Sequence, residues 1–248
     1  DIMFRNKNTP ESIFEVQRTY TAGGLAVTTN VAAICTPSHN GKGIYDGVEI
    51  PEMGTGMTTW TSMRPNSYFC DGLQTKKGND KRKTLNMAWE YDGKPFSNVG
   101  TRPWLGPKFW CPGMQNTADF NNQKIFRYAD AVLMMSECYA EQENIDESIR
   151  YLNMVKERAG LAPYTFKNIE SLMEEIQKER GRELLGEFQR KFDLVRWGIW
   201  YQMTYDYTNY STLKENMLPC HEYYPIPDKE VVYSGGALDN KAYNEYGM

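Results

Sequence analysis

The side chains best suited to acid–base chemistry stand in one charged run in the second half of the chain. The run mixes acids and bases: Glu179, Arg180, Arg182, Glu183, Glu187, Arg190, Asp193 and Arg196. Two carboxylates held at a suitable separation can act as general acid and base, or as acid and nucleophile. On a helix, however, opposite charges three or four residues apart form local ion pairs without catalytic geometry. We therefore interpret the run as structural.

Other reactive side chains are few. The chain has two histidines, His39 and His221, and five cysteines that lie far apart without a metal-binding or redox spacing. Cys220 and His221 are adjacent, but neighbouring side chains diverge and no carboxylate is placed to orient the imidazole. An acidic loop at residues 46–52 lacks the full calcium-loop pattern. We predict that the chain is not an enzyme and holds neither a cofactor nor a metal ion.

Aromatic side chains are the other residue type that could bind a ligand, and they make up 13% of the chain. Many lie among Gly, Pro and Asn rather than in apolar repeats. The candidate ligand-binding rings are Trp60, Tyr68, Trp104, Phe109 and Trp110. A ring held by a rigid turn can stack on the C–H face of a sugar, or it can pin a long loop to the core. Both interpretations stay open at this point.

The elements that would position these rings differ between the two halves. Residues 1–122 carry many turn signals, and only residues 12–20 and 84–91 alternate apolar and polar side chains as half-buried strands do. Residues 123–248 begin with helical apolar spacing. We predict a loop-rich region with short strands followed by a helical region, both within a single structural domain.

Three helices are predicted in the second region. The first begins at Lys124, and the second has Asp146 as its N-cap candidate and Gly160 at its C′ position. The third begins at Asn168 and breaks at Gly186. The first two would form an antiparallel hairpin, and the chain beyond Trp200 is predicted to be irregular.

Overall composition excludes several classes of protein. The 248 residues carry a net charge of −4, which argues against a dedicated nucleic-acid binder. No apolar stretch is long enough for a transmembrane helix. We therefore expect a folded domain of ordinary composition.

Four stretches, taken in order, resemble the SusD/RagB family of nutrient-binding outer-membrane lipoproteins. They are FRYADAVLM at 126–134, LNMVKERAGL at 152–161, the charged segment at 176–198 and YPIP at 224–227. The motif residues are Arg127, Asp130, Glu137, Glu179, Arg180, Glu183, Arg190, Asp193, Arg196 and Trp197. ESIFEVQ at 11–17 fits more loosely. Two segments depart from the family pattern, Gly186-Glu187-Phe188 and Leu238-Asp239-Asn240.

The resemblance implies a mainly α fold with long irregular loops, a few short strands and a tetratricopeptide-type helix pair of the α-α superhelix class. It implies surface binding of a glycan and transfer to a SusC-like TonB-dependent outer-membrane transporter. It also implies attachment to the outer membrane through a lipid anchor that this chain lacks. A peptide ligand, as on the RagB side of the family, and a generic helix-pair interaction module remain alternatives.

Family members are about twice as long, so the resemblance also implies that an N-terminal lobe is missing. The helix pair at residues 125–160 would then expose a face that normally stacks on other helices. Apolar side chains spread beyond one buried stripe on the first helix: Phe126, Met134, Met135, Cys138 and Tyr139. We expect an exposed apolar patch there.

Overall fold

The computed structural model describes residues 2–19, 27–54, 56, 58–114 and 116–247. It divides into two compact units, residues 1–188 and 189–248, and each is described separately. The predicted change near residue 122 lies inside the first unit. The division into a loop-rich and a helical region within a single structural domain stays a prediction, whereas the predicted mainly α fold with short strands is confirmed.

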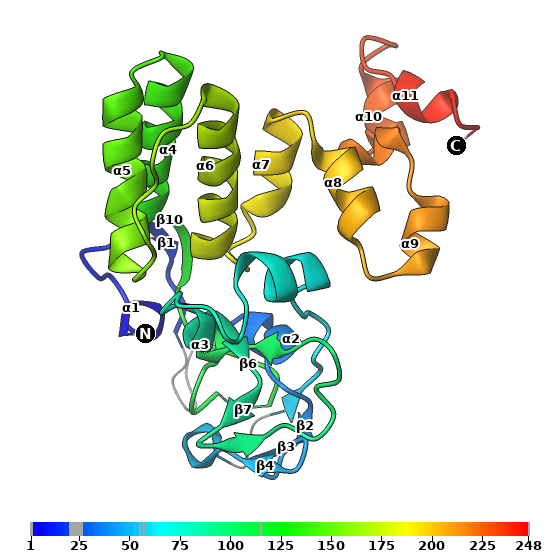
Figure 1. Cartoon of the computed structure of the whole chain (residues 1–248). Helices are drawn as coiled ribbons and strands as arrows, with labels where there is room; N and C mark the ends of the chain where they lie inside the picture. The colour runs from blue at the N-terminus through cyan, green and yellow to red at the C-terminus, as the bar shows by residue number, and fades with distance from the viewer. Residues whose placement is uncertain (1, 20–26, 55, 57, 115, 248) are drawn as a thin grey trace. The chain divides into compact units, whose positions relative to one another are not determined.

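Three helices form the helical layer of the first unit: α4 (Tyr128–Glu141), α5 (Ile145–Arg158) and α6 (Ile169–Glu183). Helices α4 and α5 form the predicted hairpin, and α6 packs against both (Figure 1). Their shared core consists of Val132, Leu133, Ala140, Leu152, Val155, Leu172 and Ile176. The two hairpin helices approach closely at Ser136 and Ser148, where each hydroxyl donates to the other residue's carbonyl oxygen at 2.8 Å.

Helix ends follow local capping chemistry. Asn168 caps α6 as predicted, because its side chain accepts a hydrogen bond from Ser171 N at 2.8 Å. Gly160 follows the C-cap of α5 with a φ of +75°, which matches the predicted C′ glycine. The N-cap of α5 is Asn144, not Asp146, so Asp146 lies within the first turn, where its charge favours the helix dipole.

The first helix begins later than predicted. Residues 123–127 form strand β10 (Gln123–Arg127), which pairs antiparallel with β1 (Ser12–Val16). Strand β1 confirms the start of the strand predicted at 12–20, although Tyr20 lies outside the described residues. Helix α4 therefore starts at Tyr128, because the backbone of the preceding residues is hydrogen-bonded to β1, more than 100 residues earlier in the chain.

The loop-rich part of the first unit is built from short elements around its own core. These are α1 (Ile2–Arg5), α2 (Val31–Cys35), β2 (His39–Asn40), β3 (Ile44–Tyr45), β4 (Val48–Glu49), η1 (Pro51–Met53), β5 (Thr58–Thr59), η2 (Tyr68–Leu73), α3 (Lys83–Asn86), β6 (Met87–Ala88), β7 (Glu90–Tyr91), β8 (Lys94–Pro95), β9 (Trp104–Leu105) and η3 (Pro107–Phe109). The core holds Ala32, Ala33, Tyr45, Val48, Ile50, Met53, Ala88, Phe96, Val99, Trp104, Trp110, Cys111 and Met114.

The prediction of a strand at residues 84–91 is wrong for the first half of that range. Residues 83–86 form the helical turn α3, and only 87–88 and 90–91 are extended. The buried side chain of Asn86 explains the difference, since its amide donates to Gln74 Oε1 and to the Arg182 carbonyl, each at 3.0 Å. These tertiary bonds fix a turn that alternation of side chains does not reveal.

The apolar face expected on the helix pair is exposed. On the first helix, Met134 and Met135 keep 41% and 39% of their surface open, and Cys138 is exposed as well. Phe126, expected on the same helix, lies instead in β10, where 44% of its surface is open. Tyr139 is half-buried and stacks on Tyr151 at a ring separation of 5.6 Å. Within the described residues, none of the helices combines the length and the apolar character needed to cross a membrane.

The second unit consists of short helical elements: α7 (Arg190–Arg196), α8 (Trp200–Tyr207), α9 (Ser211–Asn216), η4 (Pro219–Glu222), α10 (Asp228–Tyr233) and α11 (Lys241–Asn244). Helices α8 and α9 correct the prediction that the chain beyond Trp200 is irregular. Neither has a fully buried residue, so neither shows the apolar period by which a helix is found in sequence.

Candidate functional site

Trp60 is the most exposed of the predicted ligand-binding rings, with 48% of its surface open. The loop that carries it is fixed to helix α2 by backbone hydrogen bonds. Trp60 N donates to the Ala33 carbonyl at 2.8 Å, and two residues later Ser62 N donates to the Ile34 carbonyl at 2.9 Å. Strand β5, directly before Trp60, pairs with β2. The ring therefore projects from a rigid loop and keeps an open face.

The other four predicted rings are less accessible. Tyr68 is half-buried at the start of η2, whereas Trp104, Phe109 and Trp110 have only 8%, 9% and 1% of their surface exposed to solvent. Trp110 Nε1 donates to the Leu105 carbonyl at 3.1 Å. Because protein atoms cover the last three rings, we assign them to the core, in line with the loop-pinning interpretation.

The charged motif forms a buried network centred on Glu183. Its carboxylate accepts from Arg127 Nη1 at 2.6 Å, from Arg82 Nη1 at 2.6 Å and from Arg158 Nη2 at 2.5 Å. The side chains of Glu183 and Arg127 are 4% and 2% exposed. Arg127 also binds Glu187 through Nε at 2.6 Å. One carboxylate thus joins strand β10, helix α5 and the segment before α3.

Further motif residues are paired in the same way. Arg180 and Asp130 form an ion pair of 2.9 Å in which both side chains are 4% exposed. Glu179 lies between Arg82 and Arg182 at 2.7 Å from each, and Glu137 is buried. The expectation of local pairs holds for Arg182–Glu179 and Arg196–Asp193, which are three residues apart. Most of the network is tertiary, which spacing along one helix does not predict.

The remaining motif residues lie in the second unit. The guanidinium groups of Arg190 and Arg196 lie over the Trp197 ring, 5.6 and 4.6 Å from its centroid. Asp193 is buried and pairs with Arg196 at 2.9 Å. These contacts hold the end of α7 together.

Electrostatics explain how the buried carboxylates stay ionised. Burial alone would raise the pKa of Glu183, but the charges of Arg127, Arg158 and Arg82 outweigh it and hold the pKa far below its usual range. For Glu15, burial is likewise outweighed by Lys124 and Asn122, and the pKa falls to about 2. Both groups therefore bind a proton more weakly in the folded protein than in the unfolded chain.

Stability should consequently fall in acid. A carboxyl whose pKa is lowered by folding stabilises the protein above its unfolded pKa, near 4.5, and this contribution is lost as the pH falls toward the folded pKa. We expect the free energy of unfolding, measured by urea denaturation, to decrease steadily from pH 4.5 to pH 2. Glu15→Gln should reduce this slope, and Gln at exposed Glu157 should leave it unchanged. Equal slopes for Glu15→Gln and the parent would contradict the assignment.

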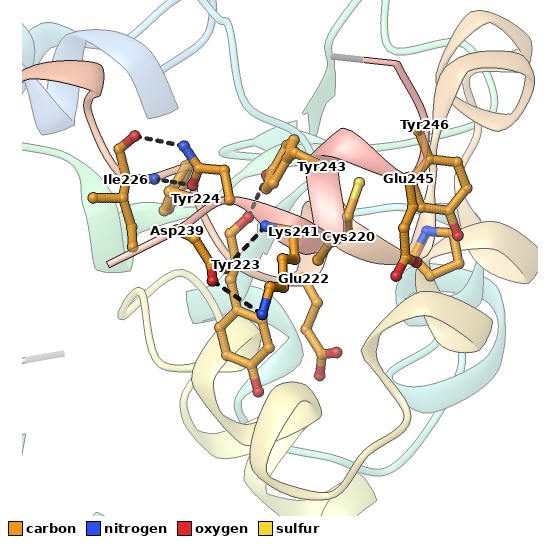
Figure 2. Close-up of a pocket in the computed structure, with 13 residues that line it drawn as sticks. Cys220, Glu222, Tyr223, Tyr224, Ile226, Asp239, Lys241, Tyr243, Glu245 and Tyr246 are labelled. Carbon is orange, nitrogen blue, oxygen red and sulfur yellow. Dashed lines mark hydrogen bonds and ion pairs between the residues drawn. The ribbon is translucent and has the colours of Figure 1, made fainter. Parts of the chain in front are cut away.

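A second surface with open rings lies in the second unit, and the sequence did not single it out. Figure 2 shows a pocket between η4, the segment after it and α11, with Tyr223, Tyr243 and Tyr246 among its walls. The signal that could have found it is the repeated pairing of tyrosine with an acidic neighbour, as in Glu222-Tyr223 and Glu245-Tyr246.

Comparison with known proteins identifies the family. The sequence profile of the SusD family matches residues 101–243, which is more than half of the chain. A SusD-like protein of Formosa agariphila is 34% identical over 175 residues, a match that covers 67% of this chain and 32% of that protein. This chain belongs to the SusD family.

Solved structures agree in fold. A SusD superfamily protein from Bacteroides vulgatus superposes with a TM-score of 0.61 at 27% identity, over 91% of this chain and 49% of that one. Surface glycan-binding protein A from Bacteroides thetaiotaomicron, in complex with laminarihexaose, gives 0.64 at 20% identity, over 92% and 51%. The chain therefore spans about half of these structures and about a third of the curated relative.

Proposed function

We propose that this chain is the glycan-binding part of a non-enzymatic surface protein of the outer membrane. It captures oligosaccharide and delivers it to a SusC-like TonB-dependent transporter, and a lipid anchor holds the whole protein to the membrane. The observation that carries the proposal is the open Trp60 ring on its pinned loop. Membership of the SusD family supports it, as does the shared fold of a relative solved with laminarihexaose.

The chemistry suits a sugar. The C–H face of a pyranose stacks on an indole ring, and a ring already fixed by its loop loses little freedom on binding. A stacking contact of this kind should contribute about 0.5–1.5 kcal/mol, by analogy with aromatic pairs. We therefore propose micromolar or weaker affinity for the isolated chain.

The proposed absence of catalysis rests on the burial of the carboxylates. The Glu179 side chain has no exposed surface and is enclosed by Arg82 and Arg182, and Glu183 is enclosed by three guanidinium groups. Because these carboxylates already accept hydrogen bonds from arginine side chains, neither is free to act as an acid or a base. The protein should release no product from polysaccharides or peptides.

Trp60→Ala tests the proposed site. Calorimetric titration with a panel of neutral and acidic oligosaccharides should give an affinity lowered about two- to tenfold, since one stacking ring is lost. Tyr128→Ala, which removes a ring that is 55% exposed on the helical layer, serves as the matched control and should bind as the parent does.

Two outcomes would overturn the proposal. Unchanged affinity of folded Trp60→Ala for every glycan would remove this ring from the site. Binding of peptides in a parallel titration, with no glycan bound, would replace the ligand class by the peptide alternative.

A further inference from the structure

The pocket of the second unit has walls that are fixed by side-chain hydrogen bonds. Asn240 pairs with the backbone of Ile226 like a second peptide group: its Oδ1 accepts from Ile226 N at 2.8 Å, and its Nδ2 donates to Ile226 O at 2.9 Å. Tyr243 Oη donates to the Tyr223 carbonyl at 2.5 Å. The departure Leu238-Asp239-Asn240 from the family pattern therefore still docks the tail, through its asparagine (Figure 2).

The space between these walls has the size and lining of a ligand site. Its volume is about 600 Å³, within the roughly 300–1,000 Å³ usual for small-molecule sites. Four tyrosines line it, and Tyr223, Tyr224 and Tyr246 keep 64%, 83% and 44% of their surface open. Lys191 lies 4.2 Å from the centroid of the Tyr224 ring. Large open rings beside a cavity can stack on a sugar, whereas Trp104 and Trp110 cannot.

Charge around the pocket is predominantly negative. Glu222, Asp239 and Glu245 line it, and among the lining residues that the structure describes Lys241 is the one cation. Lys241 pairs with Asp239 at 3.4 Å, so these two charges offset each other. Within the described residues, Glu222 and Glu245 have no hydrogen-bond or ion-pair partner for their carboxylates. Figure 2 shows Glu222 on the side of Tyr223, and Glu245 beside Tyr246 on the other.

We infer that this pocket is a second saccharide-binding site, distinct from the Trp60 loop, and that it takes saccharides without acidic groups. Tyrosine faces stack on the pyranose ring, and the free carboxylates of Glu222 and Glu245 accept hydrogen bonds from its hydroxyls. A uronic acid brings a further negative charge toward two unpaired carboxylates. Lys191, a cation outside the lining, is held against the Tyr224 ring. The inference extends the proposed function to a separate part of the chain.

The test uses the full chain carrying Trp60→Ala, so that the remaining binding reports on the pocket. Titration with a neutral β-linked glucose hexasaccharide should show residual binding. Adding Tyr223→Ala and Tyr246→Ala should weaken that binding about tenfold or more, since two rings are lost. Adding Tyr233→Ala instead, at a ring that is 80% exposed on α10 and outside the pocket, should leave it unchanged.

A second arm tests the charge preference. A glucuronic acid hexasaccharide of the same linkage should bind more weakly than the neutral one, by about fivefold for each carboxylate at contact distance in water. Glu222→Gln and Glu245→Gln should reduce the difference in affinity between the two hexasaccharides, and so should high salt. Glu215→Gln, at an exposed acid on α9 outside the pocket, should not.

The outcomes separate this inference from the proposed function. If Trp60→Ala alone abolishes all saccharide binding, or if the two tyrosine substitutions leave the residual affinity unchanged, the second site is wrong while the Trp60 site stands. If the tyrosine substitutions abolish binding that Trp60→Ala leaves intact, the pocket is the site and the Trp60 proposal is wrong. Equal affinity for neutral and acidic hexasaccharides would overturn the charge preference.

Discussion

Glu183→Gln is expected to lower the free energy of unfolding by about 3–5 kcal/mol, the usual cost of removing one partner from a buried ion pair. The carboxylate holds three guanidinium groups, from Arg82, Arg127 and Arg158, and glutamine keeps its shape without its charge. Arg127 is buried, and the Arg82 side chain is only 12% exposed. Urea denaturation at pH 7 measures the effect.

The matched control for this prediction is Glu147→Gln. Glu147 pairs with Arg150 three residues later, but both side chains lie at the surface, 38% and 51% exposed. Its replacement should not move the urea midpoint measurably, because exposed pairs are screened by water and salt. A Glu183→Gln protein as stable as the Glu147→Gln protein would show that the network does not hold the first unit together.

Gly186→Ala is expected to cost roughly 2–5 kcal/mol, the second large effect. The glycine has a φ of +70°, and a Cβ atom there would lie 2.3 Å from Phe109 Cε1. The left-handed backbone alone costs about 1–2 kcal/mol for a residue with a Cβ, and forcing the Phe109 ring aside adds about 1–3 kcal/mol. The glycine thus lies in the turn that follows α6, closed by Glu187 N donating to the Leu184 carbonyl, and leaves room for Phe109 to pack in the core beside it.

Gly100→Ala separates the two contributions. Gly100 has a φ of +62°, but nothing lies within 4 Å of its added Cβ. Its substitution should therefore show only the backbone cost. Similar losses for the two glycines in thermal unfolding would mean that Phe109 moves away freely, and that its contact with residue 186 does not stabilise the break.

Elements that form for local reasons could be predicted from the sequence. The hairpin of α4 and α5, the Asn168 cap and the Gly160 terminus follow from periods and caps within about 15 residues. Elements whose conformation depends on a partner far away in the sequence could not be predicted in this way. Residues 123–127 are extended because they pair with 12–16, and α3 turns because Asn86 bonds to Gln74 and Arg182.

For the candidate site, too, the sequence predicted the kind of residue but not its exposure. Residue type indicated that rings among glycines and prolines have a role, but not which ring faces water. Trp60 and Trp110 have similar loop contexts, yet one is 48% exposed and the other 1%. The pocket of the second unit was missed because its residues come from two segments, 219–226 and 239–246, which hydrogen bonds of Asn240 and Tyr243 bring together.

The most direct test is a crystal structure of this chain grown with the neutral oligosaccharide that binds it best. We expect sugar density stacked on Trp60, on the tyrosines of the second-unit pocket, or on both, with Trp104, Phe109 and Trp110 unmoved in the core. Sugar bound elsewhere, with the Trp60 ring and the pocket empty at saturating ligand, would contradict this expectation.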